Sequence, residues 1–185
     1  MHKHYHRKAN SGLRVAQARS CIIDVIIRSL FEHAMGKARQ PNESISHPMA
    51  VAALGSYGRA ELNPFSDIDI MFLYPDEIKS SNLSFLLQIL TDTVLYILWD
   101  LKLKVGHSTR TPKEAMEESY KSMETKTGLM EARYLAGQKR LFYDFKRDFK
   151  RFYRKSSPQT YLEVLLEAQI ARRHKFGDSV FLQEP

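Results

Sequence analysis

Apolar residues recur at helical spacing over residues 13–35, and this pattern predicts the first long helix of the chain. The apolar positions three or four residues apart include Ala18, Ile22, Val25, Ile26 and Leu30. Gly36 follows as a natural helix stop. The segment 37–48 is polar and contains two prolines, so we expect a surface connection.

Two short apolar runs predict neighbouring strands. Residues 49–54 are all apolar and are followed by a glycine, which is typical of a buried strand. Residues 67–74 form the second run, which Pro75 and Asp76 close. A polar segment, 55–66, connects the two strands.

Further helices and one more strand follow. Leucines and isoleucines on a helical repeat predict a helix over 82–99. Alternating apolar and basic residues predict a half-exposed strand over 101–109, with Lys102 and Lys104 on one face. The pair Thr-Pro at 111–112 opens a helix with three glutamates near its start, which suits the helix dipole. More helices are predicted over 127–136, 139–154 and 159–174.

This order of elements predicts an α+β domain with a small mixed sheet, flanking helices and a helical extension. The length of 185 residues fits one domain. We expect a flexible basic terminus over 1–12 and the domain over 13–185. Within the domain, 49–110 is the predicted sheet region and 111–185 the mainly helical extension.

Charge and cysteine content narrow the class of protein. Lysine and arginine number 28 against 21 acidic residues, and the net charge of +7 favours anionic partners such as nucleotides, nucleic acids or acidic proteins. A single cysteine, Cys21, excludes an intramolecular disulfide framework and a Cys-rich zinc site. The longest apolar run, 21–27 with Asp24 inside it, is too short to span a bilayer, and the basic start lacks a signal-type apolar block. We therefore expect a cytoplasmic protein without a membrane partner.

The candidate chemistry begins in the segment between the two strands. Gly55 lets the backbone approach a ligand closely, and Ser56 adds a hydroxyl at a helix start. Backbone N–H groups at such a start can hold phosphate, and Arg59 can add a charge-assisted contact. Taken alone, the segment is more typical of an ordinary strand-to-helix turn.

Asp67 and Asp69 make this segment a candidate metal site. Residues two apart in a strand point to the same side, so we expect the two carboxylates together, with Ile68 buried behind them. Like charges repel unless a cation lies between them, and such oxygens suit Mg²⁺ or Mn²⁺. Mg²⁺ takes one or two carboxylates plus substrate phosphates. The alternative is a solvated strand edge, because aspartates are mostly exposed.

The stretch 55–69, GSYGRAELNPFSDID, resembles the signature of nucleotidyltransferases of the DNA polymerase β superfamily. In its fuller form it is more similar to the protein-PII uridylyltransferase (uridylyl-removing enzyme) family. Two later segments, 98–111 (LWDLKLKVGHSTRT) and 129–137 (LMEARYLAG), are similar to the same family. The resemblance runs from about residue 13 to the end.

The resemblance implies a polymerase-β-like nucleotidyltransferase fold and Mg²⁺-dependent transfer of UMP from UTP to a tyrosine hydroxyl of the nitrogen-signalling protein PII. By likeness, Asp67 and Asp69 bind the metal and act in catalysis. The nucleotide-binding candidates are Gly55, Ser56, Arg59 and Ser66.

The chain departs from that family in two respects. The superfamily commonly supplies a third carboxylate from a neighbouring strand, but 101–109 contains lysines and no acid. Asp100 is the nearest candidate for a third catalytic acid and Glu131 a weaker one; Asp100 is otherwise a turn residue. His107 is either part of the site or a packed core residue. Members of the family are also long, so we expect this chain to be an N-terminal fragment.

Three functions follow from these observations. The first is a Mg²⁺-dependent nucleotidyltransferase. The second is a weakly active or inactive nucleotide-binding regulatory domain of the same superfamily, because the third acid is missing. The third is a nucleic-acid binder that uses 139–155, which holds eight basic and two acidic residues. The phenylalanines of that helix share one face, which favours packing over base stacking, so a nucleic-acid partner is not expected.

Overall fold

The computed structural model describes residues 12–38, 49–78 and 80–155, and four isolated positions, 166, 170, 173 and 174. The predicted basic terminus up to residue 11 lies outside the described residues, and so does the helix predicted over 159–174 apart from those positions. The chain divides into two compact units, Met1–Phe145 and Lys146–Pro185. The sheet and the candidate site belong to the first unit.

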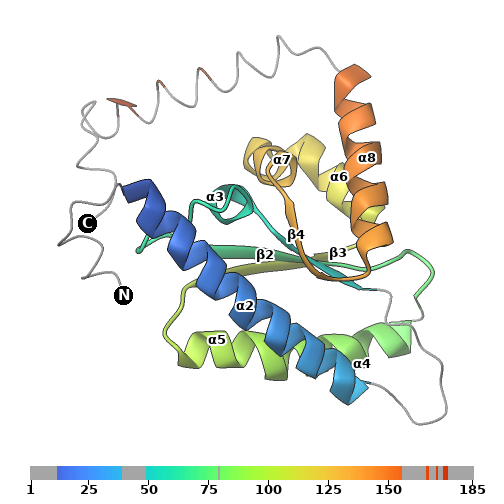
Figure 1. Cartoon of the computed structure of the whole chain (residues 1–185). Coiled ribbons are helices and arrows are strands. Elements are labelled where there is room, and N and C mark those ends of the chain that lie inside the picture. The colour runs from blue at the N-terminus through green and yellow to red at the C-terminus, as the bar shows by residue number, and fades with distance from the viewer. Residues whose placement is uncertain are drawn as a thin grey trace. The chain divides into compact units, whose positions relative to one another are not determined.

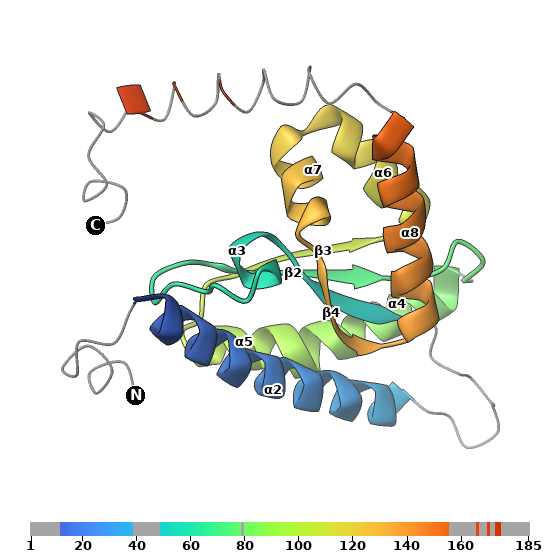
Figure 2. The same cartoon turned by 45° about the horizontal axis from the view of Figure 1, so that its top comes forward.

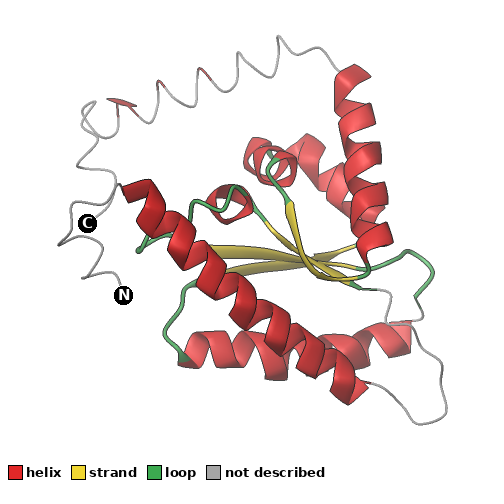
Figure 3. Cartoon of the chain, viewed as in Figure 1, coloured by secondary structure: helices red, strands yellow, loops and turns green. Residues whose placement is uncertain are grey.

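Four strands form one mixed sheet in the order β3-β2-β1-β4 (Figure 1). Their bounds are Ala50–Ala53 (β1), Ile68–Leu73 (β2), Val105–Arg110 (β3) and Arg133–Gly137 (β4). β1 pairs antiparallel with β2 and β4, whereas β2 and β3 run parallel. Figure 3 shows this sheet among the helices. The predicted α+β class with a small mixed sheet is confirmed.

Two long helical segments cover one face of the sheet (Figures 1 and 2). The first is α2 (Gly12–Ala38). The second runs without a break through α4 (Ser80–Leu90), a π-helical turn η1 (Thr91–Leu95) and α5 (Tyr96–Asp100). Both segments confirm the helices that the apolar spacing predicts.

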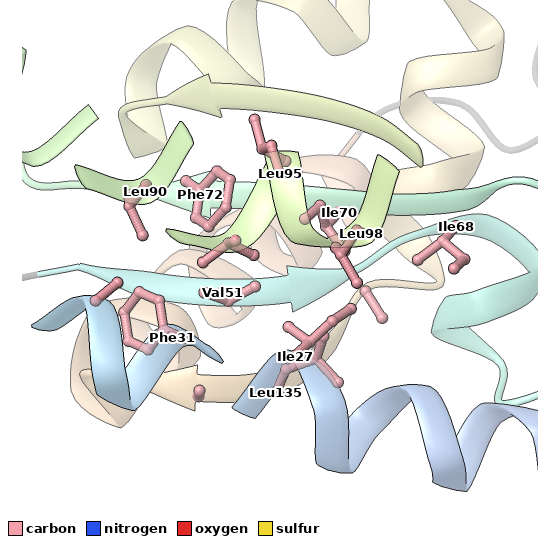
Figure 4. Close-up of a cluster of buried hydrophobic side chains, with 14 of the residues drawn as sticks. Ile27, Phe31, Val51, Ile68, Ile70, Phe72, Leu90, Leu95, Leu98 and Leu135 are labelled. Carbon is pink, nitrogen blue, oxygen red and sulfur yellow. The ribbon is translucent and has the colours of Figure 1, made fainter. Parts of the chain in front are cut away.

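The hydrophobic core lies between these helices and the sheet (Figure 4). β2 contributes Ile68, Ile70 and Phe72, and the alternation along the strand turns Asp69 to the opposite face. The core residues from the helices include Ile27, Phe31, Leu90, Leu95 and Leu98. The segment Asn82–Asp100 is long and apolar enough to cross a membrane by composition alone, and its contribution to this core accounts for that composition.

Three shorter helices lie on the other face of the sheet: α3 (Gly55–Gly58), α6 (Pro112–Lys121) and α7 (Met123–Met130) (Figure 2). α6 begins with a capping box. The Thr111 hydroxyl accepts from the Glu114 N–H at 3.2 Å, and the Glu114 carboxylate accepts from the Thr111 N–H at 2.8 Å. The helix start predicted at 111–112 is confirmed.

The helix predicted over 127–136 is wrong in its second half. α7 ends at Met130, and β4 follows as an edge strand paired with β1. Gly137 ends that strand with φ +89, and a Cβ there would overlap the Met49 carbonyl oxygen. The local residues are compatible with a helix, and pairing with β1 decides the strand.

The third strand begins later than predicted. β3 starts at Val105, because residues 101–104 form a turn in which Lys102 adopts φ 58. The final predicted helix in the described residues is confirmed as α8 (Lys139–Lys155). Its apolar face is buried at Phe142, Phe145 and Phe149.

Candidate functional site

Asp67 and Asp69 lie at the start of β2, on the side of the strand that faces away from the core. Asp67 directly precedes the strand, and Asp69 is its second residue, which reaches solvent but is partly covered, between the buried Ile68 and Ile70. Partial burial raises the pKa of Asp69, and the charge of Asp67 raises it further. The structure therefore brings the two carboxylates close together.

The Asp69 carboxylate lies between two glycines. The strand register pairs Asp69 with Gly106, and a Cβ built on Gly106 would overlap Asp69 Oδ1. A Cβ built on Gly55 would lie 3.9 Å from Asp69 Oδ2. The position beside Asp69 on the neighbouring strand thus carries no side chain, and this leaves room for the carboxylate itself.

The turn after β1 is tied to the residue that carries this carboxylate. The Leu54 N–H donates to the Asp69 carbonyl oxygen at 2.9 Å. Gly55 then adopts φ +55, a conformation that favours glycine. Gly58, at the end of the same turn, packs so closely that a Cβ would overlap the Glu131 carbonyl oxygen. The two glycines are therefore needed for different reasons, conformation at 55 and close approach at 58.

Arg59 is held between two carboxylates. Its Nε lies 3.0 Å from Glu61 Oε2, and its Nη1 lies 2.5 Å from Glu131 Oε1. The hydrogen bond to Glu61, followed by that to Glu131, raises the pKa of Arg59. If Arg59 bound a phosphate, that contact would compete with its ion pairs to Glu61 and Glu131. If Glu131 served as a third metal-binding acid, that role would compete with its ion pair to Arg59. Both assignments stay predictions.

The two candidate serines lie at opposite ends of the connection. The Ser56 carbonyl oxygen accepts from the Glu61 N–H at 2.9 Å. The Ser66 N–H donates to the Asn63 carbonyl oxygen at 3.1 Å, and Arg19 of α2 donates to the Asn63 carbonyl and, at 3.4 Å, to the Ser66 carbonyl. The backbone before the two aspartates is thus supported from α2.

Asp100 and His107 lie on other elements than the two aspartates. Asp100 is the exposed last residue of α5. His107 pairs in register with Ile70, so it lies on the face opposite Asp69, where its ring meets Trp99 edge-on at 6.0 Å. His107 is exposed and so is not a core residue either. Asp100 as a third acid stays a prediction.

Glu124 is a candidate that the sequence reasoning missed. It lies in the first turn of α7, and its charge also raises the pKa of Asp69. One helical turn later, a Cβ on Gly128 would lie 3.9 Å from Leu54 Cβ and 4.0 Å from the Gly55 nitrogen. One face of α7 therefore runs along the turn after β1, residues 54–58, which we call the glycine turn. No local motif marks Glu124, because only tertiary packing brings α7 to this turn.

The pair Asp67 and Asp69 fits a divalent cation that shares its coordination with a substrate. Among the described residues, no group of three or more His, Cys, Asp or Glu side chains could hold a metal ion. Mg²⁺ usually binds proteins through one or two carboxylates and completes its shell with water and phosphates. Burial and the charge of Asp67 raise the pKa of Asp69, and a bound cation would offset the repulsion between the two carboxylates.

Known proteins of two kinds match this sequence. The family described as glutamate-ammonia ligase adenylyltransferase (GlnE) matches residues 13–93. The bifunctional uridylyltransferase/uridylyl-removing enzyme of Novosphingobium aromaticivorans is 32% identical over 179 residues, which is 96% of this chain and 19% of that protein. The enzymes of the same description from Azospirillum brasilense and Rhodospirillum rubrum are 33% identical over 176 residues and 34% identical over 179 residues. Each is covered to 18% of its length, with 95% of this chain aligned.

Among solved structures, a toxin–antitoxin complex with AMP-PNP is similar with a TM-score of 0.37 and 15% identity, covering 75% of this chain and 98% of that chain. A mutant of the toxin-antitoxin MntA-HpeT has the same TM-score and identity, and covers 75% of this chain and 97% of that chain.

The chain spans about a fifth of the length of the curated relatives that it matches. These relatives and the matching family are named as enzymes that transfer uridylyl or adenylyl groups. The resemblance indicated by residues 55–69 is confirmed: along nearly its whole length the chain is similar to bifunctional uridylyltransferase/uridylyl-removing enzymes, and residues 13–93 match the glutamate-ammonia ligase adenylyltransferase family.

Proposed function

We propose that this chain binds a nucleoside triphosphate together with Mg²⁺ and transfers its nucleotidyl group to a protein hydroxyl. One observation carries the proposal: the Asp67 and Asp69 carboxylates lie together against the glycine turn, whose Leu54 N–H is bonded to the Asp69 carbonyl. UTP as the donor, and a tyrosine of a PII-like nitrogen-regulatory protein as the acceptor, form the finer proposal. The uridylyltransferase names of the relatives support UTP.

Each residue of the site has a definite task in this reaction. Asp67 and Asp69 would hold the ion, which when bound neutralises phosphate charge and aligns the reacting groups. Gly55 lets the backbone approach the triphosphate without a Cβ in the way. The acceptor hydroxyl gives its proton to solvent, its oxygen bonds to the α-phosphorus, and pyrophosphate leaves as its bond to that phosphorus breaks. The hydrogen bond from the Leu54 N–H to the Asp69 main-chain carbonyl fixes the start of the turn relative to the backbone of Asp69.

The direct test is incubation of the chain, and of a longer form of the protein, with Mg²⁺, each labelled nucleoside triphosphate and a PII-like acceptor. Mass spectrometry of the acceptor is expected to show an added UMP, and chelation of the metal is expected to abolish the addition. Addition of AMP instead would refute UTP as the donor but would still support nucleotidyl transfer. That result would agree with the match to the adenylyltransferase family.

A second candidate is a regulatory domain that binds nucleotide without turnover. The observation that favours it is Gly106, which takes the strand position beside Asp69 where a third acid would stand. This candidate predicts metal-dependent UTP or ATP binding with no modified acceptor. Any detectable nucleotidyl product excludes it.

Gly106→Ala tests whether the Asp69 carboxylate must lie where the structure has it. The new methyl group meets the end of a side chain and not the backbone, so the carboxylate moves and the fold is retained. We expect metal-dependent UTP binding to weaken by about 10-fold, the lower range for disturbing a metal-ligand environment. Isothermal titration measures the affinity, and circular dichroism checks the fold.

Gly36→Ala is the matched control, because a Cβ at this position in α2 meets nothing within 4 Å. It is expected to leave UTP affinity unchanged. Equal affinities for wild type and Gly106→Ala would show that the position of the Asp69 carboxylate does not matter for binding.

A further inference from the structure

An ionic cluster lies behind the glycine turn and joins three elements that are distant in sequence. We call Asp24 of α2, Tyr57 of α3 and Arg133 of β4 the Asp24 cluster. Arg133 Nη1 donates to Asp24 Oδ2 at 2.6 Å, and Nη2 donates to Oδ1 at 3.0 Å. The Tyr57 hydroxyl donates to Asp24 Oδ1 at 2.8 Å. The two oxygens of one carboxylate thus receive three hydrogen bonds.

The same guanidinium group also holds the backbone of the turn. Arg133 Nε donates to the Gly58 carbonyl oxygen at 3.2 Å, and Nη2 donates to the Tyr57 carbonyl oxygen at 3.1 Å. Only a planar group with several fixed donors can make this set of bonds, and a lysine ammonium cannot reproduce it. Arg133 therefore connects the end of the turn to both α2 and β4.

The turn is consequently held at both ends. At its start, the Leu54 N–H bonds to Asp69, the residue that carries the candidate metal-binding carboxylate. At its end, the Asp24 cluster fixes the backbone of residues 57 and 58. The Tyr57 side chain is fully buried between these elements, and the Asp24 side chain is only 13% exposed.

Stability alone is a weak reason for such a cluster. Removing charges from water costs free energy, so a buried ion pair often contributes little compared with apolar residues of similar size. Burial and the Asp24 charge raise the pKa of Tyr57, so its hydroxyl keeps the proton that it donates. What the cluster supplies beyond packing is one defined orientation of the turn.

We propose that Arg133 is a positioning residue, which acts through Asp24 and Tyr57 to hold the Gly55–Gly58 turn in the orientation that binds the nucleotide. The inference rests on the proposed function and adds residues that act behind its site. The effect of disturbing the Asp24 cluster should therefore appear in nucleotide binding rather than in folding alone.

The experiment compares Arg133→Lys and Tyr57→Phe with wild type. Arg133→Lys keeps the charge but loses the forked contacts, and Tyr57→Phe removes only the hydroxyl. We expect the Kd and KM for Mg²⁺-UTP to rise by about 10-fold in Arg133→Lys and by a smaller factor in Tyr57→Phe, as the loss of hydrogen bonds to charged groups implies. The kcat is expected to stay within about 2-fold, because the carboxylate pair is untouched.

Two matched controls separate positioning from general stability. Arg28→Lys alters a second arginine that pairs with Asp24 at 3.7 Å and donates to the Leu135 carbonyl at 3.0 Å, with no bond to the turn. Tyr74→Phe removes a hydroxyl that lies 3.4 Å from Glu114 Oε2, beyond the other end of β2. Both controls are expected to keep wild-type Kd and KM even where their melting temperature falls.

The outcomes are distinct. If Arg133→Lys and Tyr57→Phe lower the melting temperature but bind UTP like wild type, the Asp24 cluster is only structural and the inference is overturned. If Arg133→Lys does not fold, Tyr57→Phe alone decides between these results. A folded wild-type protein that neither binds nor transfers any nucleotide refutes the proposed function, and the inference falls with it.

Discussion

Replacement of Asp69 by asparagine is expected to reduce nucleotidyl transfer by at least about 100-fold, the loss usual for one group that stabilises transition-state charge. The amide keeps the shape of the side chain but carries no negative charge for the metal ion. The rate is measured as labelled UMP transferred to the acceptor. The control is Asp76→Asn, which changes an exposed aspartate beyond the other end of β2 and is expected to keep wild-type activity. Unchanged transfer by Asp69→Asn would refute the assignment of this carboxylate.

Without metal, the same variant is expected to be more stable than wild type at neutral pH. Burial, Asp67 and Glu124 raise the pKa of Asp69 above its ordinary value of 3.8. Between the ordinary and the raised pKa the folded chain binds more protons than the unfolded chain, so wild-type stability falls as pH rises through that interval. Asparagine does not titrate, so the Asp69→Asn variant does not lose this stability as the pH rises. Thermal melts at neutral pH should show a higher melting temperature for Asp69→Asn, and added Mg²⁺ should raise that of wild type only.

Gly58→Ala is expected to destabilise the fold by about 3 kcal/mol, the upper end of the usual cost of overpacking. The new Cβ would meet the Glu131 carbonyl oxygen, and it would lie 3.0 Å from the Glu131 carbonyl carbon and 3.1 Å from the Ala53 carbonyl oxygen. All of these are backbone atoms, so no side chain can move aside to relieve the clash. Urea unfolding of wild type and variant measures the difference in free energy.

Gly128→Ala is the matched comparison for stability. A Cβ at this position in α7 makes only ordinary contacts of 3.9 and 4.0 Å, and alanine is the better helix former. We expect the free energy of unfolding to rise by about 0.5–1 kcal/mol. Equal changes in the two variants would mean that the close approach at Gly58 has no energetic consequence.

Local patterns were sufficient for most of the elements. Periodic apolar residues identified α2 and the long segment α4–η1–α5, because burial of one face is visible in the residues of that face. The capping residues around Thr111 likewise carry their own bonding partners nearby in sequence. β4 was missed for the opposite reason: its residues accept a helix locally, and only the distant strand β1 makes them a strand.

The residues of the candidate site likewise fall into two groups, those that a local pattern identifies and those that only tertiary contacts place. The sequence by itself determined the spacing of Gly55, Asp67 and Asp69 along one turn and one strand, which is local, and from that spacing it predicted phosphate and metal binding. Only the tertiary structure decided that Gly106 lies against the Asp69 carboxylate, that the charge of Glu124 raises the pKa of Asp69, and that Arg133 holds the turn from behind. These three residues come from β3, α7 and β4, and strand pairing and helix packing place them. Contacts of this kind join residues far apart in the chain, so no local pattern of hydrophobic and polar positions records them.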